Sequence, residues 1–148
     1  MVNHLIYDTM SNKIIFSKLL IIFISINIFC SFKPKYVKQI YVQFGVIINK
    51  NTIKSNLENE KWFPNGDGFY LSLLTLKNSS EIEKILNQKK FVTLPIKEDL
   101  PVGEIYNKLK SLENGYYLLE VDKEDPRDFK ILTLNTTNKE IIFYYQYY

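Results

Sequence analysis

The sequence lacks alanine altogether and has one histidine, one cysteine, one tryptophan and one arginine among its 148 residues. The histidine, His4, and the cysteine, Cys30, both lie within the first 32 residues. The rest of the chain therefore excludes a Ser-His-Asp triad, a cysteine nucleophile, a disulfide framework and a His/Cys zinc site. Its five glycines are scattered, so no phosphate-binding glycine loop is present. We expect no metal and no cofactor.

The charge and composition are those of an ordinary globular protein. The formal net charge is only +3, which argues against nucleic acid as a partner recognised through bulk charge. Apolar residues make up 46% of the chain and charged residues 24%. Ile, Lys, Asn, Tyr and Phe, whose codons are AT-rich, dominate the sequence. The abundance of lysine and tyrosine is therefore not by itself evidence of function.

The most distinctive segment is an uncharged hydrophobic run over residues 19–32, which follows Lys13 and Lys18. It is shorter than the roughly 20 residues of a membrane-spanning helix and is typical of a signal-peptide core. We predict that residues 1–32 are a signal peptide or membrane anchor and that the protein belongs to the cell envelope, either anchored or secreted. Met10 opens a more ordinary leader than Met1.

The fate of this leader stays open at the sequence level. Cleavage before Ser31 has only one of the two small residues that it prefers, and lipidation of Cys30 is unlikely because Phe29 precedes it. If the leader is uncleaved, residues 14–32 are long enough to act as a membrane anchor, with the Lys18 side chain reaching the interface. A buried helix of the fold is the remaining alternative.

Residues 33–148 are predicted to form a single α+β domain. Alternating or apolar runs predict strands over Lys38–Ile48, Phe69–Leu76, Phe91–Ile96, Tyr116–Val121, Phe129–Leu134 and Lys139–Tyr148. A polar loop over 49–67 ends in a turn-forming cluster at 62–68, and Leu73-Leu74 marks a bulge or two-sided burial.

Two helices are expected between these strands. A capping box formed by Ser80 and Glu83 begins a helix over 81–89, and Pro101 begins a second helix that Asn114-Gly115 ends. We therefore predict a mainly antiparallel sheet of about five to six strands with two short helices on one face, preceded by the hydrophobic leader.

The turn at 65–68 invites a calcium interpretation, but the apolar strand that follows supplies none of the further oxygen ligands. A simple turn is favoured. The neighbouring Trp62 and Phe63 are either a binding lip or, as we favour, core anchors that hold the long loop down.

Acidic side chains gather around one predicted hairpin, interleaved with Lys123, Arg127 and Lys130. They are Glu120, Asp122, Glu124, Asp125 and Asp128. This pattern fits an acidic docking surface, a carboxylate pair for hydrolysis or a solvated turn of mixed charge, and we favour the turn.

The C-terminal strand is unusually aromatic. Strand alternation places Phe143, Tyr145 and Tyr147 on one face, and Tyr144, Gln146 and Tyr148 on the other. If the first face packs on the helices, Tyr144 and Tyr148 form an exposed ridge near Tyr116 or Tyr41. Tyrosine buries a large area at low entropic cost, so it suits binding, although it also suits half-buried sheets.

These observations favour a small exported or membrane-tethered protein, not an enzyme, that binds another protein or envelope component; a toxin-neutralising, immunity-like protein is one example. The candidate contact residues are Trp62, Phe63, Tyr144 and Tyr148. One alternative is a hydrolase using two carboxylates drawn from Asp67, Glu120, Asp122 and Asp125. Another is a structural accessory of a membrane complex.

Overall fold

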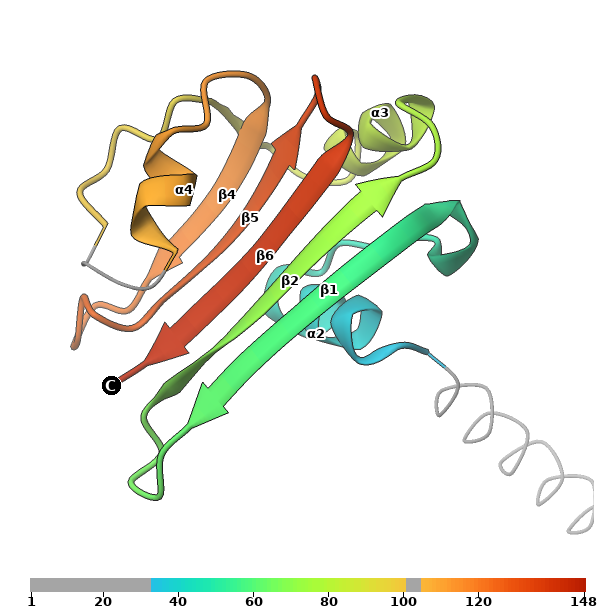
Figure 1. The fold of residues 1–148 in the computed structure, drawn as a ribbon. Helices are drawn as coiled ribbons and strands as arrows, with labels where there is room; N and C mark the ends of the chain where they lie inside the picture. Colours follow the sequence, from blue (N-terminus) through green and yellow to red (C-terminus); the bar gives the residue numbers. More distant parts are fainter. Residues whose placement is uncertain (1–32, 101–104) are drawn as a thin grey trace, which may run out of the picture. The chain divides into compact units, whose positions relative to one another are not determined.

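A computed structural model describes residues 33–100 and 105–148. The predictions for the leader, including Cys30 and the membrane contact, lie outside the described residues, as does the helix start predicted at Pro101. Residues 35–148 form one compact unit built on a six-stranded antiparallel sheet with three α-helices, so the α+β class is confirmed (Figure 1). No helix among the residues described is long and apolar enough to cross a membrane.

The helices are α2 (Lys35–Phe44), α3 (Ser80–Leu86) and α4 (Tyr106–Lys110), with a short 3-10 turn η1 (Lys50–Thr52). The strands are β1 (Ile53–Trp62), β2 (Gly68–Leu76), β3 (Val92–Thr93), β4 (Tyr116–Val121), β5 (Phe129–Asn135) and β6 (Glu140–Tyr147). Their order across the sheet is β1-β2-β6-β5-β4-β3. The predicted β4–β5–β6 meander is confirmed, and β2 matches the predicted strand within one residue.

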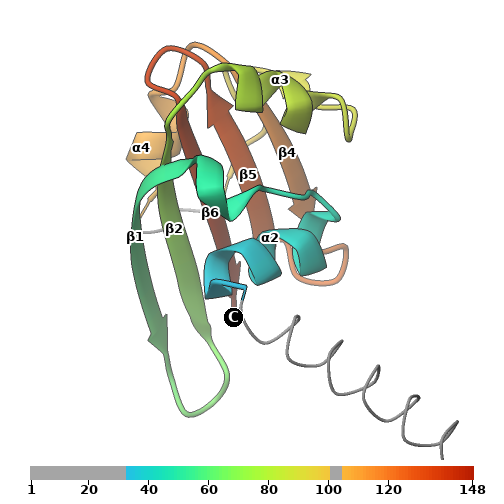
Figure 2. The same ribbon diagram turned by 90° about the vertical axis from the view of Figure 1, so that its right-hand side faces the viewer.

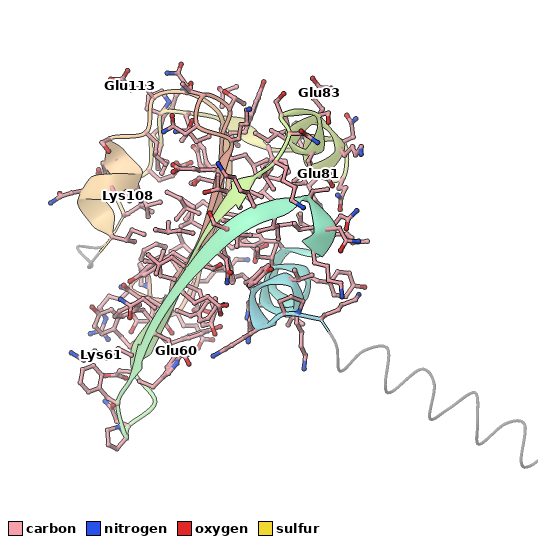
Figure 3. The ribbon with its side chains drawn as sticks, turned by 45° about the vertical axis from the view of Figure 1, so that its right-hand side comes forward. Glu60, Lys61, Glu81, Glu83, Lys108 and Glu113 are labelled. Carbon is pink, nitrogen blue, oxygen red and sulfur yellow. The ribbon has the colours of Figure 1, made fainter. Side chains whose placement is uncertain are left out.

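Both faces of the sheet are covered, which corrects the prediction that the helices share one face. Figures 2 and 3 show α2 and α3 on one side of the sheet and α4 on the other. The α2/α3 face packs around Phe143, and the α4 face packs around Ile142 and Leu109. The central strands β5 and β6 are apolar on both faces, so each face needs its own cover. Of the two predicted alternatives for Leu73-Leu74, a bulge is excluded, because β2 pairs there without a register shift. Leu74 is buried in the core of the α2/α3 face, and Leu73 is half-buried against that of the α4 face.

The predicted strand over 38–48 is wrong for most of its length. Residues 35–44 form α2, whose buried side chains are Tyr36, Val37, Ile40 and Phe44, at helical spacing. Val42, which the alternating pattern would bury, is exposed. The alternation is real only beyond the helix, where the extended segment buries Val46 and Ile48. Ile40 and Phe44 are spaced so that they fall on one face of a strand or of a helix. The prediction was wrong because it assumed the two-residue spacing of a strand.

The predicted polar loop over 49–67 is mostly the strand β1. Ile53 is half-buried, and all other residues of β1 are exposed. Neither hydrophobic alternation nor apolar content therefore marks this segment as a strand. The predicted turn is correct: the N–H of Phe63 donates to the Asp67 carbonyl at 2.8 Å and that of Gly66 to the Phe63 carbonyl at 3.0 Å.

The predicted capping box is wrong. Helix α3 begins at Ser80, so its N-cap is Ser79, and that residue makes no side-chain capping hydrogen bond. The side chain of Glu81 is buried and pairs instead with Lys84 at 3.3 Å. Burial of the first helical turn against the core replaces the expected cap.

Candidate functional site

Large aromatic side chains are exposed together where β1, β2 and β6 reach one end of the sheet. Trp62, Phe63, Tyr147 and Tyr148 have exposed fractions between 41 and 51%. Trp62 lies opposite Gly68 in the β1–β2 pairing, and Gly68 lies opposite Tyr147 in the β2–β6 pairing. We call these four side chains the aromatic end. The structure thus brings Trp62, Phe63 and Tyr148 together with Tyr147.

The exposed rings on the α2 face rest on a column of buried ones. The rings of Trp62 and Tyr147 lie 5.9 and 5.7 Å from that of Tyr145. Tyr145 in turn lies 5.5 Å from both Tyr70 and Phe143. These ring contacts connect the exposed aromatics to the hydrophobic core, so their positions are set by packing rather than by a loop.

Gly68 gives Trp62 the room to lie over the sheet. A Cβ atom at position 68 would stand 2.2 Å from the carbonyl oxygen of Lys61 and 2.6 Å from the Trp62 ring. Both distances are far below any tolerable contact. A glycine at this position is therefore required by the close approach of the Lys61 and Trp62 backbone as well as by the Trp62 ring.

Phe63 and Tyr148 carry cations close to their rings. The Lys61 ammonium lies 5.0 Å from the Phe63 ring centroid, and the Arg127 guanidinium lies 5.1 Å from that of Tyr148. The backbone N–H of Tyr148 donates to Asp128 Oδ1 at 2.6 Å, which fixes the position of this last residue. The aromatic end therefore combines ring faces with positive charge.

A hollow of about 250 Å³ opens at this end of the sheet. It is lined by Lys61, Phe63, Asp67, Gly68, Phe69, Tyr144, Gln146, Tyr147 and Tyr148. Its volume is below the roughly 300 Å³ at which small-molecule pockets begin. The geometry suits one protruding side chain of a partner better than a whole ligand.

Tyr144 is buried, which corrects the predicted exposed ridge. Its exposed fraction is 1%, and its hydroxyl donates to Gln146 Oε1 at 2.6 Å. Gln146 is also buried, and its amide donates to the Arg127 carbonyl at 3.1 Å. The Tyr144 ring packs against Phe69 of β2 and Phe129 of β5 within the core of the α4 face, so only Tyr148 of the expected ridge is exposed. Trp62 and Phe63 are likewise not the core anchors that we favoured, because both are exposed.

Three acidic side chains of the β4–β5 hairpin, those of Glu120, Asp122 and Asp125, have partners within it. Asp122 Oδ1 accepts the N–H groups of Glu124 at 2.7 Å and Asp125 at 3.2 Å. Asp125 pairs with Arg127 at 2.6 Å, and hydrogen bonds from Arg127 lower the pKa of Asp125 to about 2. Glu120 pairs with Lys130 at 2.9 Å. These contacts organise the turn.

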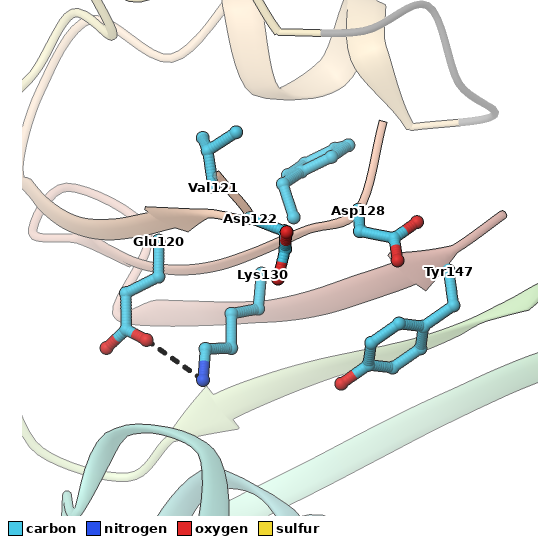
Figure 4. A pocket seen from close by; sticks show the side chains of 7 residues that line it. Glu120, Val121, Asp122, Asp128, Lys130 and Tyr147 are labelled. Carbon is cyan, nitrogen blue, oxygen red and sulfur yellow. Dashed lines mark ion pairs between the residues drawn. The ribbon is translucent and has the colours of Figure 1, made fainter. Parts of the chain in front are cut away.

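A second, smaller hollow of about 170 Å³ lies beside this hairpin (Figure 4). Glu120, Asp122 and Asp128 line it, whereas the other predicted acids, Asp67 and Asp125, do not. Asp67 instead accepts a hydrogen bond from the Asn65 amide at 2.7 Å in the preceding turn. Within the described part of the chain, no group of three or more acidic, His or Cys side chains is placed to hold a metal ion.

Sequence reasoning missed Tyr147 as a candidate contact residue. Alternation correctly placed it on the face of Phe143 and Tyr145, which was expected to pack on helices. Tyr147 is nevertheless exposed, since burial on this face fades at the end of β6. The position of Tyr147 at the end of the predicted strand could have indicated that its side chain is exposed.

Comparisons with known proteins supply no further assignment: no protein-family model matches the chain, and neither the curated proteins nor the solved structures include a significant match.

Proposed function

We propose that this protein is a non-enzymatic envelope protein, exported or tethered by residues 1–32, that binds another protein through the aromatic end. The observation that carries the proposal is the clustering of four exposed aromatic side chains at one end of the sheet, two of which, Trp62 and Tyr147, pack on the buried ring of Tyr145. Tryptophan and tyrosine supply most of the binding energy in many protein interfaces. The envelope location rests on the hydrophobic run over 19–32.

The charges beside the rings suggest the chemistry of the partner. Lys61 and Arg127 are exposed, and both lie against aromatic rings of the aromatic end. A partner surface that places carboxylates around an apolar side chain would match them. A toxin that this protein neutralises is one such partner.

The test is co-purification of the full chain from detergent-solubilised envelopes of its native host. We expect a stoichiometric protein partner whose affinity falls about tenfold or more with Trp62→Ala or Tyr148→Ala. The matched control is Tyr41→Ala, because Tyr41 is a 55% exposed aromatic residue of α2 outside the aromatic end. Retention of the partner by the Trp62 and Tyr148 variants, or the absence of any partner, would contradict the proposal.

A carboxylate-dependent hydrolase is the second candidate, favoured by the three acids that line the smaller hollow. It predicts that the chain cleaves an envelope glycan and that Asp122→Asn abolishes cleavage while binding through the aromatic end persists. No cleavage by the wild-type chain would exclude it. Because the two candidates use different residues, these experiments separate them.

A further inference from the structure

The outer edge of β1 is a long strand edge without a partner in the part of the structure that is described. β1 has ten residues, and nine residue pairs hold its inner edge to β2. The opposite edge of the sheet ends in β3, which has only two residues. The pairing with β2 has one register shift, between Ile53 and Ser55, and is continuous from Ser55 to Trp62. A long strand edge presents unpaired backbone N–H and C=O groups, which favours pairing with another strand. Residues 53–62 contain no proline to prevent such pairing.

An apolar surface reaches this edge on the α4 face of the sheet. Leu57 is 62% exposed and lies opposite Leu73, which is only half-buried, as is Leu71 two residues away. These leucines belong to β1 and β2, at the opposite margin of the sheet from β3. The edge therefore offers apolar contact as well as backbone hydrogen bonds.

We propose that β1 pairs antiparallel with β1 of a second copy of this chain, about a twofold axis at Leu57, joining the two sheets into one. The proposal does not depend on the aromatic end or its partner.

The sequence of β1 complements itself in this register. An axis at Leu57 places the two Leu57 side chains opposite each other on the α4 face. It also places Asn56 opposite Glu58 and Ser55 opposite Asn59, so no like charges are directly opposed. Asn56 already donates to Glu58 of its own chain at 3.0 Å, and its second amide hydrogen is suited to the Glu58 of the second copy.

Neighbouring registers are poorer. Directly opposed residues in an antiparallel pair point to the same face of the sheet. A twofold axis between two neighbouring residues would oppose side chains that point to different faces, so the axis must pass at a residue that faces its own copy. An axis at Glu58 opposes two Glu58 carboxylates, and one at Asn59 opposes Glu58 and Glu60. An axis at Asn56 separates the leucines and shortens the pairing, which then runs only from Ile53 to Asn59. A second copy in the Leu57 register thus satisfies charge, apolar contact and length together.

The register is tested by disulfide trapping of the full chain in detergent, with Cys30→Ser removing the native thiol. Under mild oxidation, Leu57→Cys should give a covalent dimer, since opposed Cβ atoms lie about 5 Å apart. The matched control is Asn59→Cys, whose two copies would lie about 13 Å apart along the strands. A mixture of Ser55→Cys and Asn59→Cys should give the mixed dimer. Equal trapping of Leu57→Cys and Asn59→Cys, or none, overturns the proposal.

Sedimentation of the chain without introduced cysteines provides an independent readout. We expect a concentration-dependent dimer that Leu57→Lys weakens by about tenfold or more, because two ammonium groups then meet at the axis. Leu57 is largely exposed, so this change should leave the circular dichroism spectrum unaltered. A chain that is monomeric at every concentration, or a dimer that Leu57→Lys does not weaken, contradicts the proposal. A dimer formed through the leader would be unaffected by Leu57→Lys.

Discussion

At the scale of single residues, Gly68 determines whether Trp62 can occupy the aromatic end. Gly68→Ala forces a Cβ atom against the Lys61 backbone and the Trp62 ring. We expect a loss of about 1–3 kcal/mol in unfolding free energy and a displaced Trp62 indole. Urea unfolding and the NMR shift of the indole N–H measure the two effects.

The matched control for this prediction is Gly66→Ala. Gly66 also has a positive φ, 98°, but an added Cβ would meet nothing within 4 Å. Gly66→Ala should therefore lower the unfolding free energy by only about 1–2 kcal/mol, because alanine is strained at a positive φ, and should leave the Trp62 indole resonance in place. A Gly66 variant that moves the indole as far as the Gly68 variant does would show that turn strain, not the lack of space, is responsible.

Tyr144 should behave as a core residue, although the sequence made it a candidate contact residue. Tyr144→Phe removes the hydroxyl that donates to the buried Gln146, so we expect about 1–2 kcal/mol of lost stability. Tyr144→Ala should cost about 3–5 kcal/mol. Chemical unfolding monitored by circular dichroism measures both. A stable Tyr144→Phe variant that no longer binds the partner would reverse this assignment.

The prediction for the aromatic strand β6 shows which structural information a local sequence pattern carries. Alternation in residues 143–148 correctly separated the two faces, because that period belongs to the strand itself. It could not tell which face is covered, since the core that contains Tyr144 also includes side chains from residues 94–100 and 105–112, remote in sequence. Trp62 and Phe63 were found for a reason independent of fold: they are large apolar side chains within a turn-forming segment.

At the scale of elements, an ion pair links α2 to the edge strand β1. Lys35 donates to Glu60 across this junction, and that hydrogen bond is the main cause that lowers the pKa of Glu60 below 4.5. The folded state therefore holds the Glu60 carboxylate more strongly than the unfolded chain does. The resulting stability is present above about pH 4.5 and is lost as the pH falls through the lowered pKa.

Lys35→Ala should raise the Glu60 pKa toward its ordinary value and flatten the loss of stability below about pH 4.5. Both side chains are nearly half exposed, so the contribution should be at most about 1 kcal/mol. NMR titration of Glu60 and urea unfolding between about pH 3 and 6 measure the two effects. Lys38→Ala, on the same helix, is the charge-matched control. An equal pKa change in both variants would indicate a general charge effect instead of the pair.

The elements that sequence reasoning found and missed differ in how much apolar surface they bury. β2, β4, β5 and β6 are buried enough for their patterns to be read directly. β1 exists because it pairs with β2, and its own side chains carry no hydrophobic signal. In α2, Ile40 and Phe44 fit both periods, and only tertiary contacts decide between them.

At the scale of the whole molecule, the described core is built from residues that follow the leader. The first buried core residue of the α2 face is Tyr36. Deleting residues 1–32 should therefore leave the unfolding free energy within about 0.5 kcal/mol of that of the full chain, while envelope association is lost. Urea unfolding and membrane flotation of the two chains provide the comparison. A deletion that unfolds the remaining chain would instead support a structural role for the hydrophobic run.

β1 carries both the unpaired edge and, at its last residue, Trp62. If two copies pair about Leu57, their Trp62 residues lie about 33 Å apart along the joined strands, on opposite sides of the axis. The two aromatic ends then point in opposite directions, so one dimer can bridge two partner molecules or grip two sites of a repeating one. Simultaneous engagement would multiply weak contacts into avidity, and a modest affinity at each aromatic end would suffice for lasting attachment.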